Sequence, residues 1–423
     1  IEDFVVCKNY PEIPIIVPVD AKGRLTEEAG MFAGLTTEEA NKPIALHLEK
    51  IGALFALKKI EHQYPHCWRC HKPVIFRATS QWFCSVDDFK DEAVKAAEDV
   101  KWFPEWGKDR LQSMVKERAD WCISRQRKWG VPIPVVYCQD CGKEIIDNDI
   151  MMKVSKIFGE EGSDAWFAHD TEYFLPEGFK CPHCGSAKGF DKEKDIMDVW
   201  FDSGSSHAAV CARRKYLKVP ADVYLEGADQ YRGWFQSSLL TSVAGGNGAP
   251  YKQIITHGWT VDGEGKKMSK SLGNGIAPQE IISKYGADIL RLWVASADYH
   301  ADIRISPEIL KQISDNYRKL RNTARYCLSN LYDFDPDKDM VSNDELEELD
   351  KYALMKLDEV IKIARDAFEV YDYHTAAHSL HNFCVVEMSN FYFDVLKDRL
   401  YTSAPQSKTR RAAQTVLYKV LDA

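Results

Sequence analysis

The sequence predicts an α/β fold followed by an all-helical region, and three observations lead to this prediction. Strand-like and helix-like segments alternate along the chain until about Ser306, which is typical of an α/β core. Beyond Pro307 the apolar residues recur only at helical spacing. The length of 423 residues also exceeds what one hydrophobic core usually supports, so we expect roughly two to four domains.

The chain up to residue 62 is expected to hold short apolar strands and one helix. The apolar run at 15–19 is typical of a strand, and Pro18 within it favours a sheet edge because proline has no amide hydrogen to donate. A helix is expected from about Pro43 to Leu57, since proline suits the first turn of a helix. We expect the α/β core from residue 63 onward.

Between residues 63 and 306 the alternating pattern surrounds a cysteine-bearing insertion. A tryptophan-rich stretch leads into a helix from Trp106 to Ala119 and a strand from Trp121 to Arg125. The insertion then runs from about residue 136 to 195, and strands and helices return after it.

Two strands of the predicted core end in polar residues. The segment 224–230 is a strand that runs into a glycine turn, and a helix from Tyr231 to Leu240 follows it. The segment 253–261 is typical of a buried strand. Open α/β sheets bind ligands at the carboxyl ends of their strands. We therefore expect a ligand site near the polar groups Glu226, Asp229, Gln230 and His257.

The loop at 266–274, KKMSKSLGN, concentrates ammonium groups, hydroxyls and a glycine. An ammonium on a flexible stem can follow phosphate charge as it moves, and glycines permit backbone conformations that other residues resist. The alternative is an ordinary solvated surface turn. Because the buried strand at 253–261 precedes it, we favour a triphosphate-binding loop with Lys270 and Lys267 as its candidate cations.

Six of the twelve cysteines fall into three Cys-x-x-Cys pairs. Two pairs, each followed by glycine, supply four thiolates, which matches tetrahedral zinc in a structural role because no position is left open. These predicted ligands are Cys138, Cys141, Cys181 and Cys184. The third pair, Cys67 and Cys70, forms a half-site without a matching pair, and His66 and His71 are alternative ligands there. Unbound cysteines remain the alternative at each site.

Composition limits the class of protein. An apolar content of 45% is ample for globular folding. No apolar run approaches the roughly 20 residues of a membrane span, and no leader opens the chain, so we expect a soluble cytoplasmic protein. The net charge of −9 argues against a uniformly basic nucleic-acid binder. Basic clusters at 125–128, 318–325 and 408–411 are either solvated faces or local RNA contacts.

Five blocks of the sequence resemble class I aminoacyl-tRNA synthetases, and isoleucyl-tRNA synthetases in particular. The block HGWTVDGEGKKMSKSLGN, which begins at His257, is similar to the second signature of the class. The other blocks begin at Ala119 (ADWCISRQRKWGVPIP), Asp198 (DVWFDSGSSH), Tyr224 (YLEGADQYRGWF) and Ile313 (ISDNYRKLRNTARYCLSNLYDF). They follow the family's order, and the match runs nearly from end to end.

The resemblance implies the second half of a class I Rossmann-like catalytic core. Residues 1–62 would be the C-terminal part of an inserted editing domain, and 63–306 the core with a zinc-binding insertion at about 136–195. Residues 307–423 would be a truncated helical anticodon-binding domain. The family's first signature, His-Ile-Gly-His, is not in the sequence. We therefore expect an internal piece of a longer, usually monomeric enzyme, inactive alone.

The resemblance also implies the reaction, in which isoleucine is activated with ATP and Mg²⁺ and then transferred to tRNA(Ile). Lys270, assisted by Lys267, would stabilise the leaving pyrophosphate. ATP and the adenylate would be bound by Glu226, Gly227, Asp229, His257, Gly258 and Met268. The amino acid would be bound by Gln230, Trp234 and Trp200. For the tryptophans, ordinary core packing is the alternative.

An apolar pocket rejects a side chain lacking one methylene by only about 1–3 kcal/mol. Valine would therefore enter an isoleucine pocket, which gives a physical reason for hydrolytic editing of mischarged valine. The resemblance makes Asp3 a candidate editing ligand that holds the amino group of the mischarged residue. A simple surface aspartate near the terminus is the alternative.

Other functions remain open at this point. The nearest is a valine-specific enzyme of the same class. A second is a zinc-stabilised RNA-binding module without chemistry of its own, for which the helical region, basic clusters and cysteine pairs suffice. A third is a degenerate relative that serves as a scaffold.

Overall fold

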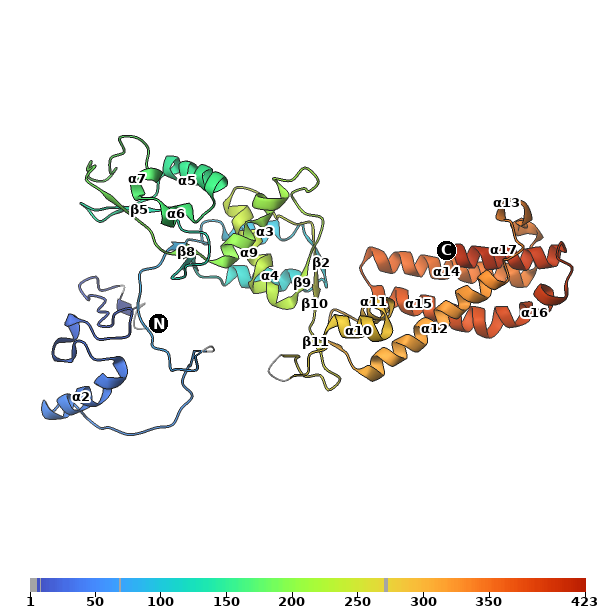
Figure 1. Cartoon of the computed structure of the whole chain (residues 1–423), viewed down its shortest axis with the longest axis horizontal. Helices are drawn as coiled ribbons and strands as arrows, with labels where there is room; N and C mark the ends of the chain where they lie inside the picture. Colours follow the sequence, from blue (N-terminus) through green and yellow to red (C-terminus); the bar gives the residue numbers. More distant parts are fainter. Residues whose placement is uncertain (1–5, 8, 68–69, 270–272) are drawn as a thin grey trace. The chain divides into compact units, whose positions relative to one another are not determined.

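The computed structural model describes residues 6–7, 9–67, 70–269 and 273–423, so the predicted site residues Asp3 and Lys270 lie outside the described residues. The chain divides into two compact units, Ile1–Trp82 and Phe83–Ala423 (Figure 1), and each is described by itself. The domain limits predicted at residues 62 and 306 stay predictions. Among the helices that the structure describes, none has the length and apolar content needed to cross a membrane.

The helix of the first unit, α2, begins at Thr37 and runs to Lys50, earlier than predicted. Thr36 forms a reciprocal cap with Glu39. The Thr36 hydroxyl accepts from the backbone N–H of Glu39, and the Glu39 carboxylate accepts from the backbone N–H of Thr36 at 2.8 Å. Such a capping box fixes where a helix starts. The prediction that Pro43 opens the helix was wrong, because Pro43 lies inside it.

Residues 15–19 lie outside any strand, so the strand predicted there was wrong. Val19 forms an isolated bridge with Leu25, and Ile15 and Ile16 are exposed. An apolar run becomes a strand only where a partner strand and a buried face exist for it. A short helix, η1 (Glu27–Phe32), precedes α2.

Three parallel strands form the sheet of the α/β core in the order β2-β10-β9. They are β2 (Lys101–Phe103), β10 (Gln253–His257) and β9 (Tyr224–Gly227). The register sets Thr256 beside Glu226 and His257 beside Gly227. The carboxyl ends of β9 and β10 therefore meet at one edge of the sheet.

Helices gather around these strands and share one apolar core with them (Figure 1). They are α3 (Lys90–Ala96), α4 (Gly107–Lys116) and α9 (Trp234–Ala244). Trp102 of β2, Ile254 of β10 and Phe235 of α9 are all buried. The helix expected at 231–240 is split, because η3 (Ala228–Arg232) ends at Gly233 before α9 begins.

The strand predicted through Val261 is interrupted after His257. The chain continues as β11 (Thr260–Val261), which pairs in parallel with β12 (Ile303–Arg304) instead of extending β10. Between the two strands, the backbone N–H of Gly258 donates to the carbonyl of Tyr299 at 2.9 Å. The local apolar pattern could not reveal this break, since the partner comes from a distant segment.

The cysteine-bearing insertion has a core of its own. Its antiparallel sheet has the order β6-β5-β7, with β6 (Glu144–Ile145), β5 (Val136–Cys138) and β7 (Phe190–Lys192). Helices α5 (Asn148–Glu161), α6 (Ala165–Ala168) and α7 (Thr171–Phe174) cover it. The predicted strand at 121–125 forms two short strands. One of them, β4 (Ser124–Arg125), pairs with β8 (Ile196–Met197) at the base of the insertion.

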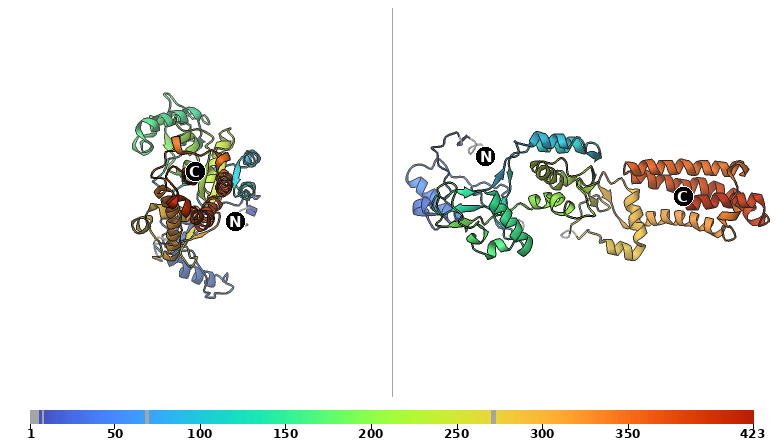
Figure 2. Two further views of the ribbon diagram at one scale, coloured as in Figure 1. Left: turned by 90° about the vertical axis from the view of Figure 1, so that its right-hand side faces the viewer. Right: turned by 90° about the horizontal axis from the view of Figure 1, so that it is seen from above.

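The chain beyond Pro307 is helical, as predicted, and its long helices lie side by side (Figure 2). Ser306 accepts a hydrogen bond from the backbone N–H of Ile309 and so caps the first long helix, with Pro307 in the first turn. The long elements are α12 (Pro307–Ser329), α14 (Glu348–Glu369), α15 (Tyr373–Asn382), η5 (Phe383–Tyr392), α16 (Phe393–Thr402) and α17 (Lys408–Asp422). They follow α10 (Pro278–Tyr285) and α11 (Ala287–Ser296).

Candidate nucleotide site and cysteine cluster

The edge where β9 and β10 end brings several predicted nucleotide ligands together. A Cβ atom added at Gly227 would lie 2.7 Å from Oδ1 of Asp229 and 3.6 Å from Cε1 of His257. The carboxylate and the imidazole thus converge beside a residue that has no side chain. Glu226 is exposed at the same edge. This edge offers two carboxylates and an imidazole to a polar ligand.

The predicted amino-acid ligands gather around Gly233. A Cβ atom there would lie 2.5 Å from Oε1 of Gln230 and 2.8 Å from Cη2 of Trp200. Trp200 belongs to α8 (Val199–Gly204) and is 41% exposed. Gln230 accepts a hydrogen bond from the backbone N–H of Trp234 at 2.9 Å. The three side chains predicted to hold the amino acid are therefore neighbours.

Trp234 is also a packing residue. Its ring stacks on Tyr224 of β9 with 4.0 Å between centroids, and its indole N–H donates to the carbonyl of Ser203 at 2.9 Å. These contacts fix the orientation of the indole. Ordinary core packing, the alternative for this residue, accounts for one face of its ring, while Trp200 keeps more of its surface free.

The described part of the lysine loop is fastened at its base by Asn274. Its Oδ1 accepts from the backbone N–H of Ser269 at 3.0 Å, and its Nδ2 donates to Asp262 at 2.9 Å and to the carbonyl of Lys267 at 3.3 Å. One amide thus joins both sides of the loop. Sequence reasoning missed Asn274, although a side chain that both donates and accepts, placed at the end of a loop, is the signal for such a clamp.

Two further loop residues have defined contacts. The ammonium of Lys267 lies 5.0 Å from the ring centroid of Trp259, in a cation–π arrangement. Met268 packs against the apolar cluster that contains Ile281 and Trp293. Met268 therefore anchors the loop to α10 and α11, a contact that was not anticipated.

Gly258 occupies a place without room for a side chain. A Cβ atom there would lie 2.4 Å from the carbonyl carbon of Ala301 and 2.6 Å from the backbone nitrogen of Asp302. Asp302 in turn accepts from the backbone N–H of Trp259 at 2.7 Å. The loop before β12 therefore holds the backbone directly after His257.

We expect Gly258→Ala to destabilise the protein by about 1–3 kcal/mol, because backbone atoms must move to admit the methyl group. The matched control is Gly248→Ala, where nothing lies within 4 Å of the added atom and the change should stay within about 0.5 kcal/mol. Urea unfolding measures both free energies. Equal stability of the two variants would contradict the close approach at Gly258.

The four predicted zinc ligands come together in the insertion. Their Sγ atoms all lie within 4.8 Å of one another, with 3.7 Å between Cys138 and Cys184 and 3.8 Å between Cys141 and Cys181. A tetrahedron with metal–sulfur bonds of about 2.3 Å has edges of roughly 3.8 Å. The spacing therefore fits a single ion at the centre, and the four thiols can hold a metal ion.

The two halves of this cluster are built alike. Gly142 and Gly185 both have positive φ, and their N–H groups donate at 2.8 Å to the carbonyls of Cys138 and Cys181 respectively. Burial alone would raise the pKa of Cys181, but the backbone N–H groups of Cys184 and His183 outweigh it and lower that pKa to about 6. The turn after Cys181 thus favours a thiolate at that position, whereas hydrogen bonds with the neighbouring cysteines raise the pKa of Cys184.

The half-site at Cys67 and Cys70 gains no further ligand among the described residues. Among the described residues, the four-cysteine cluster is the one group of three or more His, Cys, Asp or Glu side chains that lie close enough together to hold an ion. His66 uses its Nδ1 in a 2.8 Å hydrogen bond with the carbonyl of Tyr64. Metal binding at this half-site stays a prediction.

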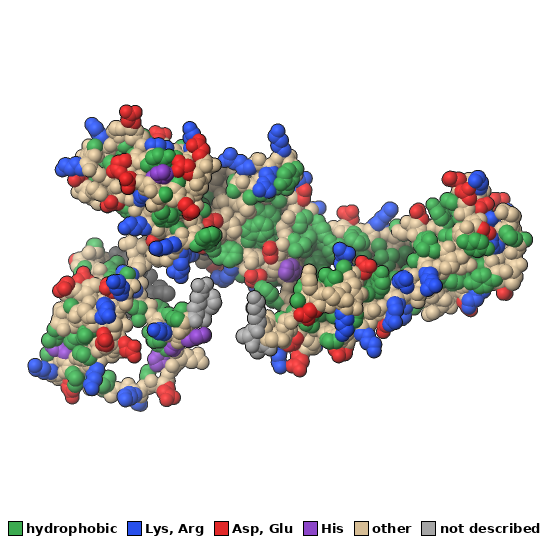
Figure 3. Space-filling view, viewed as in Figure 1, with side chains coloured by type: hydrophobic (Ala, Val, Ile, Leu, Met, Phe, Trp, Pro, Cys, Tyr) green, Lys and Arg blue, Asp and Glu red, His purple; other side chains and the backbone are tan. Residues whose placement is uncertain are grey.

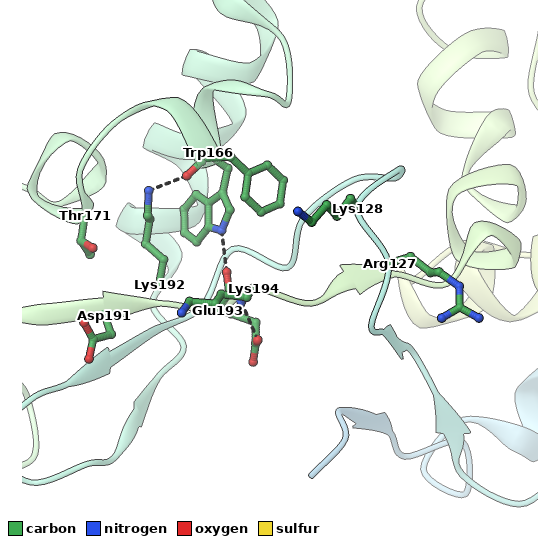
Figure 4. Close-up of a pocket in the computed structure, with 9 residues that line it drawn as sticks. Arg127, Lys128, Trp166, Thr171, Asp191, Lys192, Glu193 and Lys194 are labelled. Carbon is green, nitrogen blue, oxygen red and sulfur yellow. Dashed lines mark hydrogen bonds between the residues drawn. The ribbon is translucent and has the colours of Figure 1, made fainter. Parts of the chain in front are cut away.

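A pocket of about 800 Å³ lies beside the insertion (Figure 4) and involves none of the predicted site residues. Two of its lining side chains, Lys192 and Trp166, have hydrogen-bond partners within the insertion. The ammonium of Lys192 donates to the carbonyl of Trp166, and the indole N–H of Trp166 donates to the carbonyl of Glu193 at 2.8 Å. These bonds serve the folding of the insertion.

Comparison with known proteins shows the family to which the chain belongs. Residues 19–306 match the family of class I tRNA synthetases (I, L, M and V), and residues 350–423 match the anticodon-binding domain of tRNA ligase. The isoleucine–tRNA ligase of Caldicellulosiruptor saccharolyticus is 60% identical over 99% of this chain. That of Caldanaerobacter subterraneus is 58% identical over 100% of it. The chain spans 45% of the length of each of these relatives.

Solved structures show the same fold at low sequence identity. The methionyl-tRNA synthetase of Mycobacterium tuberculosis in complex with methionyl-adenylate has a TM-score of 0.58 at 19% identity, covering 84% of this chain and 61% of that one. The LeuRS of Agrobacterium radiobacter has a TM-score of 0.51 at 20% identity, covering 72% and 39%. With a family match over residues 19–306, the chain belongs to the class I tRNA synthetases.

Proposed function

We propose that this chain is part of an isoleucine–tRNA ligase, which activates isoleucine with ATP and transfers it to tRNA(Ile). The observation that carries the proposal is the identity of 55–60% to proteins of that name across essentially the whole chain. A valine-specific enzyme is less well supported, since these relatives carry the isoleucine name. We include in the proposal a monomeric state and a cytoplasmic location.

Activation joins the isoleucine carboxylate to the α-phosphate of ATP, and the bond to pyrophosphate breaks. Such a reaction needs positioning and charge stabilisation more than covalent help from the protein. Lys267 and Lys270 would stabilise the leaving pyrophosphate together with Mg²⁺. The nucleotide would lie along the edge where β9 and β10 end. Its proposed ligands there are Glu226, Gly227, Asp229, His257, Gly258 and Met268.

The amino-acid pocket would lie beside Gly233. The Oε1 of Gln230 would receive the ammonium of isoleucine, and Trp200 and Trp234 would form the apolar wall for its side chain. An apolar wall of this kind discriminates valine by only about 1–3 kcal/mol. Editing of mischarged valine, with Asp3 as a ligand of its amino group, therefore remains part of the proposal.

The remaining parts would serve RNA binding and folding. Zinc in the four-cysteine cluster would be structural, because four thiolates leave no open coordination position. The helical region would bind tRNA. Lys and Arg side chains gather along α12 (Figure 3), where Lys319, Arg321 and Arg325 are exposed. Exposed cations on one helix suit contacts with RNA phosphates.

Isoleucine-dependent exchange of pyrophosphate into ATP by the full-length protein tests the proposal. We expect exchange with isoleucine far above that with leucine or methionine, and weaker exchange with valine. Lys267→Gln should lower kcat about tenfold, the effect of 1.4 kcal/mol in the transition state. Lys266→Gln is the matched control, because Lys266 forms an exposed ion pair with Glu264.

Two outcomes would contradict the proposal. Exchange driven by valine better than by isoleucine would assign the chain to a different specificity. Unchanged exchange after Lys270→Ala, with tRNA binding intact, would favour an RNA-binding module whose lysine loop has no chemical role.

A further inference from the structure

The turn between α14 and α15 holds a tyrosine in a backbone conformation that tyrosine rarely adopts. The backbone N–H of Tyr371 donates to Phe368 at 3.2 Å, and that of Asp372 donates to Ala367 at 2.8 Å. This pair of bonds is the Schellman ending of a helix, whose left-handed position usually holds glycine. Here it holds Tyr371 with φ of 59°. A tyrosine in this conformation is strained. Its presence therefore indicates that the side chain makes contacts that glycine could not make.

The side chain of Tyr371 contacts two strands of the core sheet. Its hydroxyl donates to Oε1 of Gln253 at 3.2 Å, and its ring meets that of Phe103 edge-on with 4.9 Å between centroids. Gln253 is the first residue of β10, and Phe103 is the last residue of β2. A side chain of the helical region therefore packs against the sheet whose edge forms the candidate nucleotide site.

The backbone of Tyr371 is fixed from the same direction. Its carbonyl accepts from the hydroxyl of Tyr299 at 2.8 Å. Burial raises the pKa of Tyr299 to about 12, so this hydroxyl keeps its proton at neutral pH. The carbonyl of Tyr299 accepts in turn from the backbone N–H of Gly258 at 2.9 Å. Tyr299 thus links the helical turn to the backbone next to His257.

We infer that Tyr299 and Tyr371 are positioning residues that hold the His257–Gly258 backbone in place for ATP and couple it to the helical, RNA-binding region. This inference rests on the proposed function. Neither side chain needs to touch the reacting atoms. Their effect passes through the hydrogen bond to Gly258 and through the end contacts with β2 and β10.

The test compares Tyr299→Phe, Tyr371→Phe and Tyr373→Phe in the full-length protein by isoleucine-dependent pyrophosphate exchange. The first two each remove one hydroxyl bond, and we expect each to raise the KM for ATP about fivefold, the effect of one such bond, with kcat nearly unchanged. Tyr373→Phe is the matched control, because its hydroxyl has no hydrogen bond among the described residues and its KM should stay at the wild-type value.

A second readout does not depend on activity. Hydrogen exchange at the Gly258 amide should be faster in Tyr299→Phe than in wild type, and addition of tRNA should slow it in wild type but not in the variant. A KM for ATP within twofold of wild type in both variants, or an equal rise in Tyr373→Phe, would overturn the inference. Wild-type protein without isoleucine-dependent exchange would instead refute the proposed function, and the Gly258 amide would still report on positioning.

Discussion

Replacing Cys181 by serine should abolish metal retention and unfold the insertion between β5 and β7. Cys181 is 2% exposed, and its thiol is one corner of the four-sulfur cluster. Structural zinc sites supply about 10–16 kcal/mol of apparent binding free energy at neutral pH, which exceeds what the small core of the insertion can replace. Metal analysis of the purified protein and hydrogen exchange of the α5 amides measure the two effects.

The matched control is Cys211→Ser, which changes a partly exposed cysteine outside the three Cys-x-x-Cys pairs. It should leave the metal content and the exchange of α5 unaltered. A wild-type protein that holds no zinc and still protects α5 would show that the insertion folds without an ion. In that case the 3.7 Å spacing between Cys138 and Cys184 would reflect packing alone.

Asp333→Ala should destabilise the helical region by about 3 kcal/mol, because it leaves the buried guanidinium of Arg410 without its carboxylate. Asp333 accepts from Arg410 at 2.6 and 3.1 Å and from Nε2 of Gln414 at 2.8 Å. Arg410 and Arg411 are 5% and 6% exposed. The exposed pair Asp394–Lys397 provides the control, where Asp394→Ala should cost no more than about 1 kcal/mol. Urea unfolding measures both variants.

The same residue gives a pH dependence with a definite sign. Hydrogen bonds from Arg410 hold the pKa of Asp333 below its usual range, against the effect of burial. The unfolded chain therefore binds this proton more tightly than the folded chain does. The stabilisation is complete above the unfolded pKa of about 3.9 and is lost as pH falls through the lower, folded value. The stability difference between wild type and Asp333→Ala should accordingly shrink below about pH 4.

The sequence predicted those parts of the fold that depend on local patterns. The helices after Pro307 follow from apolar spacing, and the meeting of β9 and β10 follows from two strands that end in polar residues. The cysteine cluster follows from spacing and from the glycine turns. In each case the residues that decide the structure lie close together in the chain or repeat a known chemical pattern.

The remaining features of the fold depend on contacts between residues that lie far apart in the chain, which local sequence patterns do not predict. The break after His257 requires Tyr299, and the buried arginines of α17 require Asp333. The stacking of Trp234 on Tyr224 depends on the packing of α9 against β9, two elements whose contact no local pattern predicts. The start of α2 at Thr37 could have been found, because the Thr36–Glu39 capping box is local.

The clamp at the base of the lysine loop has a chemical weakness. Asn274 is followed by Gly275, and asparagine before glycine is the pair in which the next backbone nitrogen attacks the side-chain amide most readily, with release of ammonia. Opening of the resulting ring by water leaves an acid in place of the amide. That acid could still accept from Ser269, but it would repel Asp262 instead of donating to it. Slow deamidation, a hazard that rises with temperature, would thus loosen the loop as the protein ages.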